Sequence, residues 1–317
     1  MSLKKTYKAE SHKITTIRRI VQITAFIAIN YVIIEFIFSV NLKAFEPFIK
    51  VLPVLNSPRN PLSNGAGFTE YLFYFITQGV FPFLIIAVFM FVILFTGRFF
   101  CGWICPIGTI QDGLTYVPTD KKKLKIKTNK ALSNFKYMII ILLLILIVPL
   151  GITKLTDTAF YVDYKENLGD WAEKPIGFFS LSEFIFVFFP NLITAMWENI
   201  EVNVFEPLFT DFWVFFTFFF YIIVVILSLY YPRFYCRFIC PFAAIAAAIS
   251  DYSFLKLTRS PVRCVGRTEC GICERVCPKQ IRILDEPFEF FTGNGECNLC
   301  LKCMENCPYD AINIKFG

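Results

Sequence analysis

The strongest constraint on the fold is a set of four apolar runs, each about as long as a helix that crosses a bilayer. The runs cover residues 20–40, 71–96, 137–152 and 212–231, and the second holds 26 residues without a charged side chain. Hydrophobic residues make up 56% of the chain and aromatic residues 18%, which is too apolar for an ordinary soluble domain of this length. The sequence therefore predicts a mainly α-helical membrane protein with four transmembrane helices.

Positive charge alternates along the segments between these runs. Lys and Arg number 6, 3, 8, 3 and 11 in the successive segments outside the runs. Because cytoplasmic segments carry the excess of positive charge, we expect a multi-pass protein of the cytoplasmic membrane, with segment 1–16, the lysine-rich loop between Lys121 and Lys136, and the tail all cytoplasmic. A further apolar stretch, 178–197, would place the tail outside if it crossed the membrane. It is broken by Glu183 and Pro190, so we expect an interfacial or half-inserted helix there.

The second and fourth runs end in nearly the same motif. Arg-Phe-Phe-Cys-Gly-Trp-Ile-Cys-Pro begins at Arg98, and Arg-Phe-Tyr-Cys-Arg-Phe-Ile-Cys-Pro begins at Arg233, 135 positions later. We therefore expect the membrane domain, 17–252, to consist of two parallel repeats whose Cys-x3-Cys-Pro motifs meet at the cytoplasmic face. Proline suits the first turn of a helix, which places the second cysteine of each motif near a helix N-terminus, where the dipole lowers a thiol pKa.

These membrane motifs supply four cysteines, for which three interpretations stay open. They could together hold an iron–sulfur or other metal centre, they could form redox-active thiol pairs, or they could be reduced cysteines that pack between the repeats. The residues concerned are Cys101, Cys105, Cys236 and Cys240.

Three charged residues near the motifs are candidates for a cofactor site. Arg98 and Arg233 could neutralise an anionic centre or bind a quinone carbonyl, although arginines at a membrane edge also serve as simple topology anchors. Asp112 follows the first motif, whereas Ala247 stands at the matching place after the second. Only one half needs a proton acceptor if a quinol is oxidised there, so Asp112 is the candidate catalytic residue.

The tail, 253–317, carries the most specific pattern. Four cysteines ending in Cys-Pro have the x2, x2, x3 spacing of bacterial ferredoxins, and four upstream cysteines have the spacing x5, x2, x3. In two-cluster ferredoxins the last cysteine of each run binds the other cluster. The sequence thus predicts a small α+β ferredoxin-like domain with two [4Fe–4S] clusters, one bound by Cys264, Cys270, Cys273 and Cys307, the other by Cys297, Cys300, Cys303 and Cys277. The main alternative is a pair of zinc knuckles, which share the Cys-x2-Cys unit but lack the Cys-Pro endings. If Cys264 does not bind iron, the first cluster would be a three-iron form.

Composition and motifs exclude several other functions. The single histidine, His12, lies in the polar N-terminal segment, so the membrane region has no histidine pair to hold a b-type haem. No glycine-rich dinucleotide motif or phosphate-binding loop is present. The chain has a net charge of +6, and its Lys and Arg residues lie beside the apolar runs, where they would orient the protein in the membrane. We therefore expect no binding of nucleic acid. Cysteines spaced as metal ligands imply a reducing compartment.

Four apolar runs with two Cys-x3-Cys-Pro motifs before a two-cluster tail resemble the NapH, NosR and CcoG group of polyferredoxin-like membrane proteins, and NapH most closely. The resemblance runs from about Tyr71 to the end, but the chain is too short for the flavin domain of NosR-like members, and the first interval after Cys264 is wider than usual. It implies a subunit that passes electrons between the quinone pool and a respiratory reductase, or one that reduces a metal during oxidase assembly.

The predicted function is that of an iron–sulfur electron-transfer subunit in the membrane. It would pass electrons between the quinone pool, or another membrane cofactor, and a partner oxidoreductase through the two tail clusters. One alternative is a copper reductase or metal-centre assembly factor that uses the four membrane cysteines. Another is a non-catalytic membrane anchor in which the clusters are structural. The expected partners are lipid, oxidoreductase subunits and a quinone.

Overall fold

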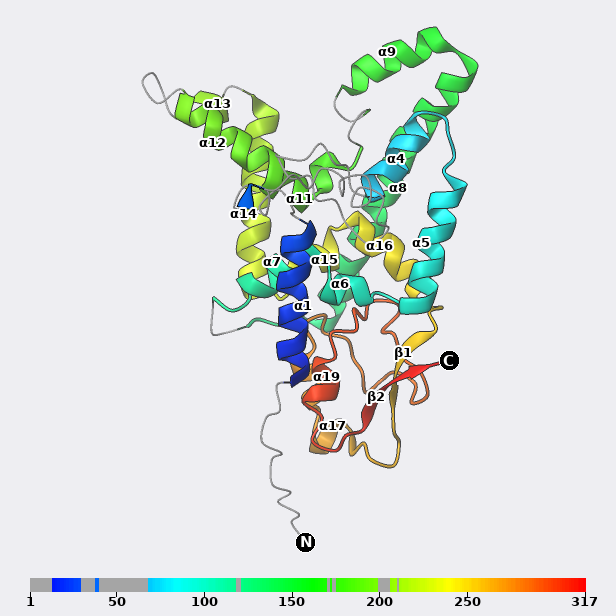
Figure 1. The fold of residues 1–317 in the computed structure, drawn as a ribbon, viewed down its shortest axis with the longest axis vertical. Coiled ribbons are helices and arrows are strands. Elements are labelled where there is room, and N and C mark those ends of the chain that lie inside the picture. The colour runs from blue at the N-terminus through cyan, green and yellow to red at the C-terminus, as the bar shows by residue number, and fades with distance from the viewer. Residues whose placement is uncertain are drawn as a thin grey trace.

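The computed structural model describes residues 13–29, 38–39, 68–117, 121–169, 172, 175–198, 206–209 and 211–317. Most of the predicted N-terminal segment 1–16 and the second half of the predicted run 20–40 lie outside the described residues. Within them the chain is mainly helical, and the tail contains a small sheet. Figure 1 shows the tail, coloured orange to red, at one end of the molecule, with α9, α12 and α13 at the other end.

Two of the described helices are long and apolar enough to cross a membrane, α8 (Ile126–Thr156) and α14 (Phe212–Tyr230). They contain the third predicted run and nearly all of the fourth. α8 begins 11 residues before its apolar run, because the lysine-rich segment continues the same helix. The structure therefore bears out two long apolar helices, and the arrangement with four transmembrane helices stays a prediction.

The other two predicted runs are shorter helices in the described part of the chain. The first run falls partly in α1 (Lys13–Ile29), and the second is divided between α4 (Phe68–Thr77) and α5 (Phe83–Thr96). The division has a local cause, since Gly79 has a φ of +70° and Pro82 precedes α5. A Cβ atom on Gly79 would lie 2.9 Å from the Gly151 carbonyl oxygen, so α4 and α8 approach closely at this break.

Both repeats have the same order of elements. In the first, α5 leads into α6 (Phe99–Trp103) and α7 (Pro106–Leu114); in the second, α14 leads into α15 (Phe234–Phe238) and α16 (Pro241–Ser250). The helix that precedes each motif packs against the other repeat, since α5 contacts α16 and α14 contacts α7. The Phe89 ring of α5, for example, meets the Phe242 ring of α16 edge to face at 5.6 Å. The two repeats therefore interlock around their cysteine motifs.

The stretch 178–197 is not one regular helix. It comprises the 3-10 turn η2 (Gly177–Phe179), the short helix α11 (Leu181–Glu183), the π-helix η3 (Phe184–Phe188) and α12 (Phe189–Glu198). Its predicted position at the membrane interface stays a prediction. The remaining helices here are α9 (Thr158–Leu168) and α13 (Glu206–Phe209).

The tail folds around a two-stranded antiparallel sheet. β1 (Leu255–Arg259) pairs with β2 (Ile312–Phe316), Leu255 opposite Phe316 and Arg259 opposite Ile312. The short helices α17 (Gly266–Glu269), α18 (Ile272–Val276) and α19 (Lys302–Glu305) carry the cysteine runs. Trp103 of α6 is buried in the same hydrophobic cluster as Leu257 of β1, so the membrane domain and the tail share a core.

Candidate metal centres

The twelve cysteines surround three cavities, four at each. The distal cavity is lined by Cys264, Cys270, Cys273 and Cys307. The proximal cavity is lined by Cys277, Cys297, Cys300 and Cys303. The embedded cavity is lined by Cys101, Cys105, Cys236 and Cys240, two from each repeat. The structure thus brings together the same groups of four that the sequence assigns to two clusters and to a membrane site.

The spacing of the cysteine groups suits a cluster rather than a single ion. A zinc ion needs four sulfurs at about 2.3 Å from it, whereas a [4Fe–4S] cube takes one thiolate on each of four irons. Among the described residues, no three metal-binding side chains converge closely enough to hold one ion. The donor set therefore fits iron–sulfur clusters.

The chain folds tightly around the proximal cavity. Leu299 and Leu301, on either side of Cys300, have φ angles of 47° and 58°, in the left-handed region that leucine rarely adopts. Such strained backbone is maintained only where surrounding contacts impose it, often at functional sites. Here it wraps the Cys297–Cys303 run around the cavity.

Hydrogen-bond donors point at several of the sulfur atoms. At the distal cavity, the Ala311 N–H lies 3.3 Å from the Cys307 sulfur. At the embedded cavity, the Gln111 side-chain amide lies 3.3 Å from the Cys236 sulfur, and the Ala243 N–H lies 3.4 Å from that of Cys240. N–H groups on cysteine sulfurs are a recurring feature of iron–sulfur sites, where they help to set the reduction potential.

Both repeats place their second motif cysteine where the proline predicts. Cys105 is the N-cap of α7 and Cys240 is the N-cap of α16, with proline at the first helical position. The helix N-terminus does not by itself make Cys240 acidic, because burial, followed by repulsion from Cys236, raises the pKa of Cys240 to about 12. A thiolate at this depth therefore needs a bound cation, which a metal centre supplies.

Three cations also line the embedded cavity, and all are buried: Arg98, Arg233 and Lys279. Arg98 donates to the Glu296 carboxylate at 2.9 Å, and Lys279 donates to the backbone oxygen of Cys236 at 3.3 Å. Because neither arginine reaches the surface, a role beside an anionic centre fits them better than that of a membrane-edge anchor. Their predicted part in cofactor binding stays untested.

Asp112 lies in a buried ion-pair network. Both of its carboxylate oxygens accept hydrogen bonds of 2.8 Å from Arg233, and Arg18 and Arg19 of α1 lie at 3.6 and 3.4 Å. Burial alone would raise the pKa of Asp112, but Arg233 and Arg18 outweigh it and hold the pKa well below the ordinary value. A proton acceptor needs a pKa near the working pH, so these contacts favour a structural role over the predicted catalytic one, which no observation tests directly.

The membrane domain and the tail meet between the embedded and proximal cavities. The Trp103 indole N–H donates to the Leu299 carbonyl oxygen at 2.9 Å. Gly102 packs against Asn298 so closely that a Cβ atom on the glycine would lie 2.2 Å from the Asn298 carbonyl oxygen. The motif between Cys101 and Cys105 thus contacts the loop between Cys297 and Cys300.

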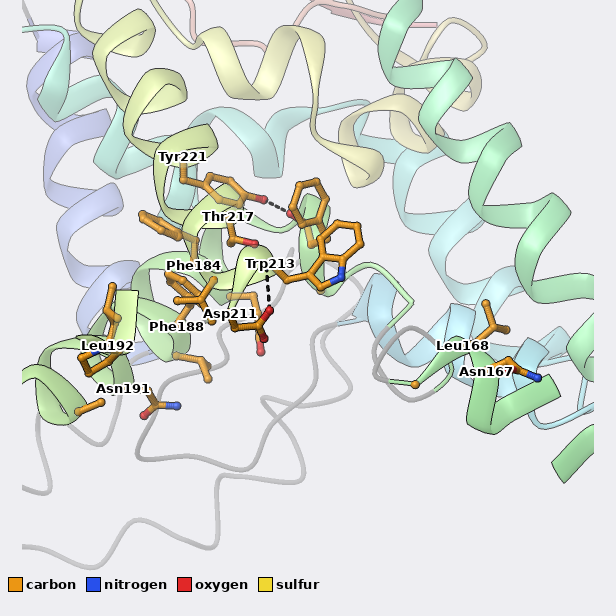
Figure 2. A pocket seen from close by; sticks show the side chains of 18 residues that line it. Asn167, Leu168, Phe184, Phe188, Asn191, Leu192, Asp211, Trp213, Thr217 and Tyr221 are labelled. Carbon is orange, nitrogen blue, oxygen red and sulfur yellow. Dashed lines mark hydrogen bonds between the residues drawn. The ribbon is translucent and has the colours of Figure 1, made fainter. Parts of the chain in front are cut away.

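A larger opening, the aromatic cavity, lies between α14 and the π-helix (Figure 2). Its volume is about 690 Å³, and its walls include Glu183, Phe184 and Tyr221. The rings of Phe184 and Tyr221 stack at 4.6 Å. Tyr221, hydrogen-bonded to the Phe178 carbonyl oxygen, belongs to the same buried cluster as Tyr235 and Cys240. The aromatic and embedded cavities are therefore separated by packed aromatic side chains.

Sequence reasoning did not assign several of these residues. Lys279 and Glu296 each lie within two positions of a tail cysteine, but only the fold brings them to the membrane motif. Tyr221 lies in a run of phenylalanines, where no pattern distinguishes it. Gln111 had a weak signal, its place just after the first motif.

Comparisons with known proteins agree with iron–sulfur binding. A protein-family model described as "4Fe-4S binding domain" matches residues 78–126 and 213–259, and each range contains one Cys-x3-Cys-Pro motif. A ferredoxin of Methanothermococcus thermolithotrophicus is 30% identical over 53 residues, 17% of this chain and 87% of the ferredoxin. No solved structure matches.

A second relative is an uncharacterised protein of Methanocaldococcus jannaschii, 31% identical over 71 residues, which are 22% of this chain. The match spans only 26% of that relative. The two matches to the 4Fe-4S domain and the ferredoxin homology nevertheless define the class of protein. The chain belongs to the polyferredoxin-like iron–sulfur proteins.

Proposed function

We propose that this protein carries electrons at a membrane between a quinone and a partner oxidoreductase, using three iron–sulfur centres. The observation that carries this proposal is the presence of three four-cysteine cavities in one chain. The helices α6 and α15, which contain Cys101 and Cys236, lie between the tail and α11, which precedes the π-helix of the aromatic cavity (Figure 1). The eight tail cysteines would hold two [4Fe–4S] clusters and the four membrane cysteines a third. Such clusters supply one-electron redox chemistry over a wide range of potentials.

The contacts between the cavities support a series of centres. Cys300 of the proximal group is close enough to Arg233 of the embedded cavity to interact electrostatically with it, and Cys273 of the distal group interacts with Cys303 in the same way. Gly102 and Trp103 connect the embedded cavity to the proximal cavity. The chain's own part is to fix these positions and to keep water out, since Cys105, Cys240 and Cys300 are buried.

The buried cations have a clear electrostatic purpose in this proposal. Four thiolates and a cluster are anionic, and an uncompensated charge in an apolar interior is costly. Arg98, Arg233 and Lys279 would offset that charge. They would also favour the more negative, reduced state and so raise the reduction potential of the embedded centre.

The aromatic cavity is the proposed quinone site. Its aromatic walls suit a lipophilic ring, and single-turn π-helices such as Phe184–Phe188 occur often at functional sites. Oxidation of a quinol releases two electrons and two protons. The electrons would leave one at a time toward the embedded centre, past Tyr221. Glu183 in the cavity wall would receive one proton, and water in the cavity would receive the other.

The charge pattern supports a topology with the tail in the cytoplasm. Three segments predicted on that side lie together, since Thr15 of α1 donates to Glu305 of α19 at 3.0 Å and Lys123 of the lysine-rich loop donates to the Glu274 carbonyl oxygen at 3.5 Å. Their shared position at the tail end agrees with the charge rule. The four-span arrangement is part of this proposal.

Iron and acid-labile sulfide measured on the anaerobically purified full chain would test the centres. We expect about 12 irons per chain, about 8 in Cys236→Ser and about 8 in Cys300→Ser. Unchanged iron in Cys236→Ser would refute the embedded centre. Thiol-only coordination also suits Cu(I), so bound copper together with absent quinol-dependent reduction would favour the metal-reductase alternative. A Cys300→Ser variant that still passes electrons normally would favour a structural anchor.

A further inference from the structure

A positively charged cavity opens beside the proximal cavity, between the lysine-rich loop and the tail. This basic cavity has a volume of about 540 Å³. Five cationic side chains and one cysteine of the proximal group line it: Lys121, Lys122, Lys123, Arg275, Lys302 and Cys277. Nothing in the proposed quinone chemistry uses it.

Among the described residues that line this cavity, cations outnumber acids five to one. The one acid among them, Asp112, is already paired with Arg233 behind the wall. Lys121 and Lys302 are close enough to repel each other: burial and then Lys302 lower the pKa of Lys121. Like charges gathered around one opening attract an anionic partner from a distance.

Cys277 connects this charged opening to the proximal cluster site. It belongs to the proximal cavity but also lines the basic cavity and is only partly buried there. A protein docked over it would come close to the proximal centre, and electron transfer slows steeply with distance. Arg275 on α18 and Lys302 on α19 also line the opening, and these two helices contain Cys273 and Cys303.

We propose that the basic cavity is the docking site of a small acidic one-electron carrier protein, which exchanges electrons with the tail at Cys277. This inference rests on the proposed function. One electron leaves the carrier and enters the proximal centre, or the reverse, and no bond forms or breaks. Long lysine side chains from separate segments suit a broad acidic surface, whereas a small phosphate is more often held by backbone N–H groups at a glycine-rich turn.

Binding of an acidic plant-type ferredoxin to the full chain in lipid nanodiscs tests the inference. We expect the affinity to fall at least about tenfold as salt rises from low to high ionic strength, because screening weakens such attraction. Lys121→Glu should weaken binding by about tenfold, and Lys302→Glu likewise. Lys315→Glu is the matched control, since Lys315 lies exposed on β2, is not among the residues that line the basic cavity, and carries the same charge change.

The readout is affinity, with iron content measured on every variant. Lys302 lies beside Cys303, so a loss of iron in Lys302→Glu would leave Lys121→Glu as the decisive variant. Equal affinity of wild type and Lys121→Glu at full iron content would overturn the inference, and so would tighter binding of pyrophosphate than of the ferredoxin. If the wild type has its full iron content and is reduced by quinol but does not bind the ferredoxin, the docking site alone is refuted. If the wild type lacks the iron, the proposed function is refuted.

Discussion

At the scale of single residues, the embedded cavity depends on buried charges that hold each other in place. Asp112 of α7 links its own helix to the second repeat and to α1, because it is ion-paired with Arg233 and with Arg18 and Arg19 of α1. Arg233 itself has a φ of 56°, a backbone conformation that a side chain of this kind rarely adopts. Removing one partner of such a network leaves a buried charge uncompensated, which costs more than the ion pair contributes.

We therefore expect Asp112→Asn to destabilise the protein by about 3 to 5 kcal/mol, measured by thermal or denaturant unfolding. Asp163→Asn, an exposed carboxylate on α9, is the control and should change stability by less than about 0.5 kcal/mol. The folded-state pKa of Asp112 lies below the unfolded value of about 3.9, so its contribution is complete at neutral pH and is lost only as the pH falls below that value. Near-equal stability of the two variants would contradict this account.

At the scale of elements, the contact between α6 and the tail is set by one glycine. A Cβ atom at position 102 would lie 2.2 Å from the Asn298 carbonyl oxygen, a distance at which backbone must move. We expect Gly102→Ala to separate α6 from the tail, expose Trp103 and speed proteolysis of the tail. Tryptophan fluorescence and limited proteolysis measure these changes.

Gly113 on α7 is a matched control, because an added Cβ there meets nothing within 4 Å. Gly113→Ala should be neutral or stabilise by up to about 1 kcal/mol, since alanine favours a helix. If Gly102→Ala behaved like Gly113→Ala, the tail would not be docked through α6.

The elements also show what could be read from the sequence. The cysteines around each cavity are those that the ferredoxin pattern and the repeat predict to lie together, and what they bind stays a prediction. The run at 137–152 and nearly all of the run at 212–231 lie in long helices. The packing of α5 and α14 against the opposite repeat could not be predicted, because helices that are apolar on all sides have no face that indicates their neighbours. The ion pairs Asp112–Arg233 and Glu296–Arg98 join residues more than a hundred positions apart, and no local pattern carries that information.

At the scale of the whole molecule, α1 and the lysine-rich first part of α8 contact the tail at one end, while α9 and α12 lie at the other (Figure 1). If α8 and α14 cross the membrane, the ends of α8 face opposite sides. Lys127 and Lys130 then lie on the side of the tail, and Lys154 and Lys165 lie on the other. In that case the charge rule predicts a cytoplasmic position for the first pair.

Sealed vesicles of opposite orientation test this arrangement with trypsin, which cuts after lysine and arginine. In inside-out vesicles we expect cleavage in the lysine-rich segment and the tail and protection of Lys154 and Lys165, with the reverse in right-side-out vesicles. Detergent-opened vesicles, in which both groups are cut, are the control for intrinsic accessibility. Cleavage at Lys127 and Lys165 from the same side would mean that α8 does not span the bilayer, and the aromatic and basic cavities would then not be separated by a membrane. The expected pattern would instead place quinol oxidation within the membrane and carrier docking in the cytoplasm, so that electrons pass between them only through the interlocked repeats.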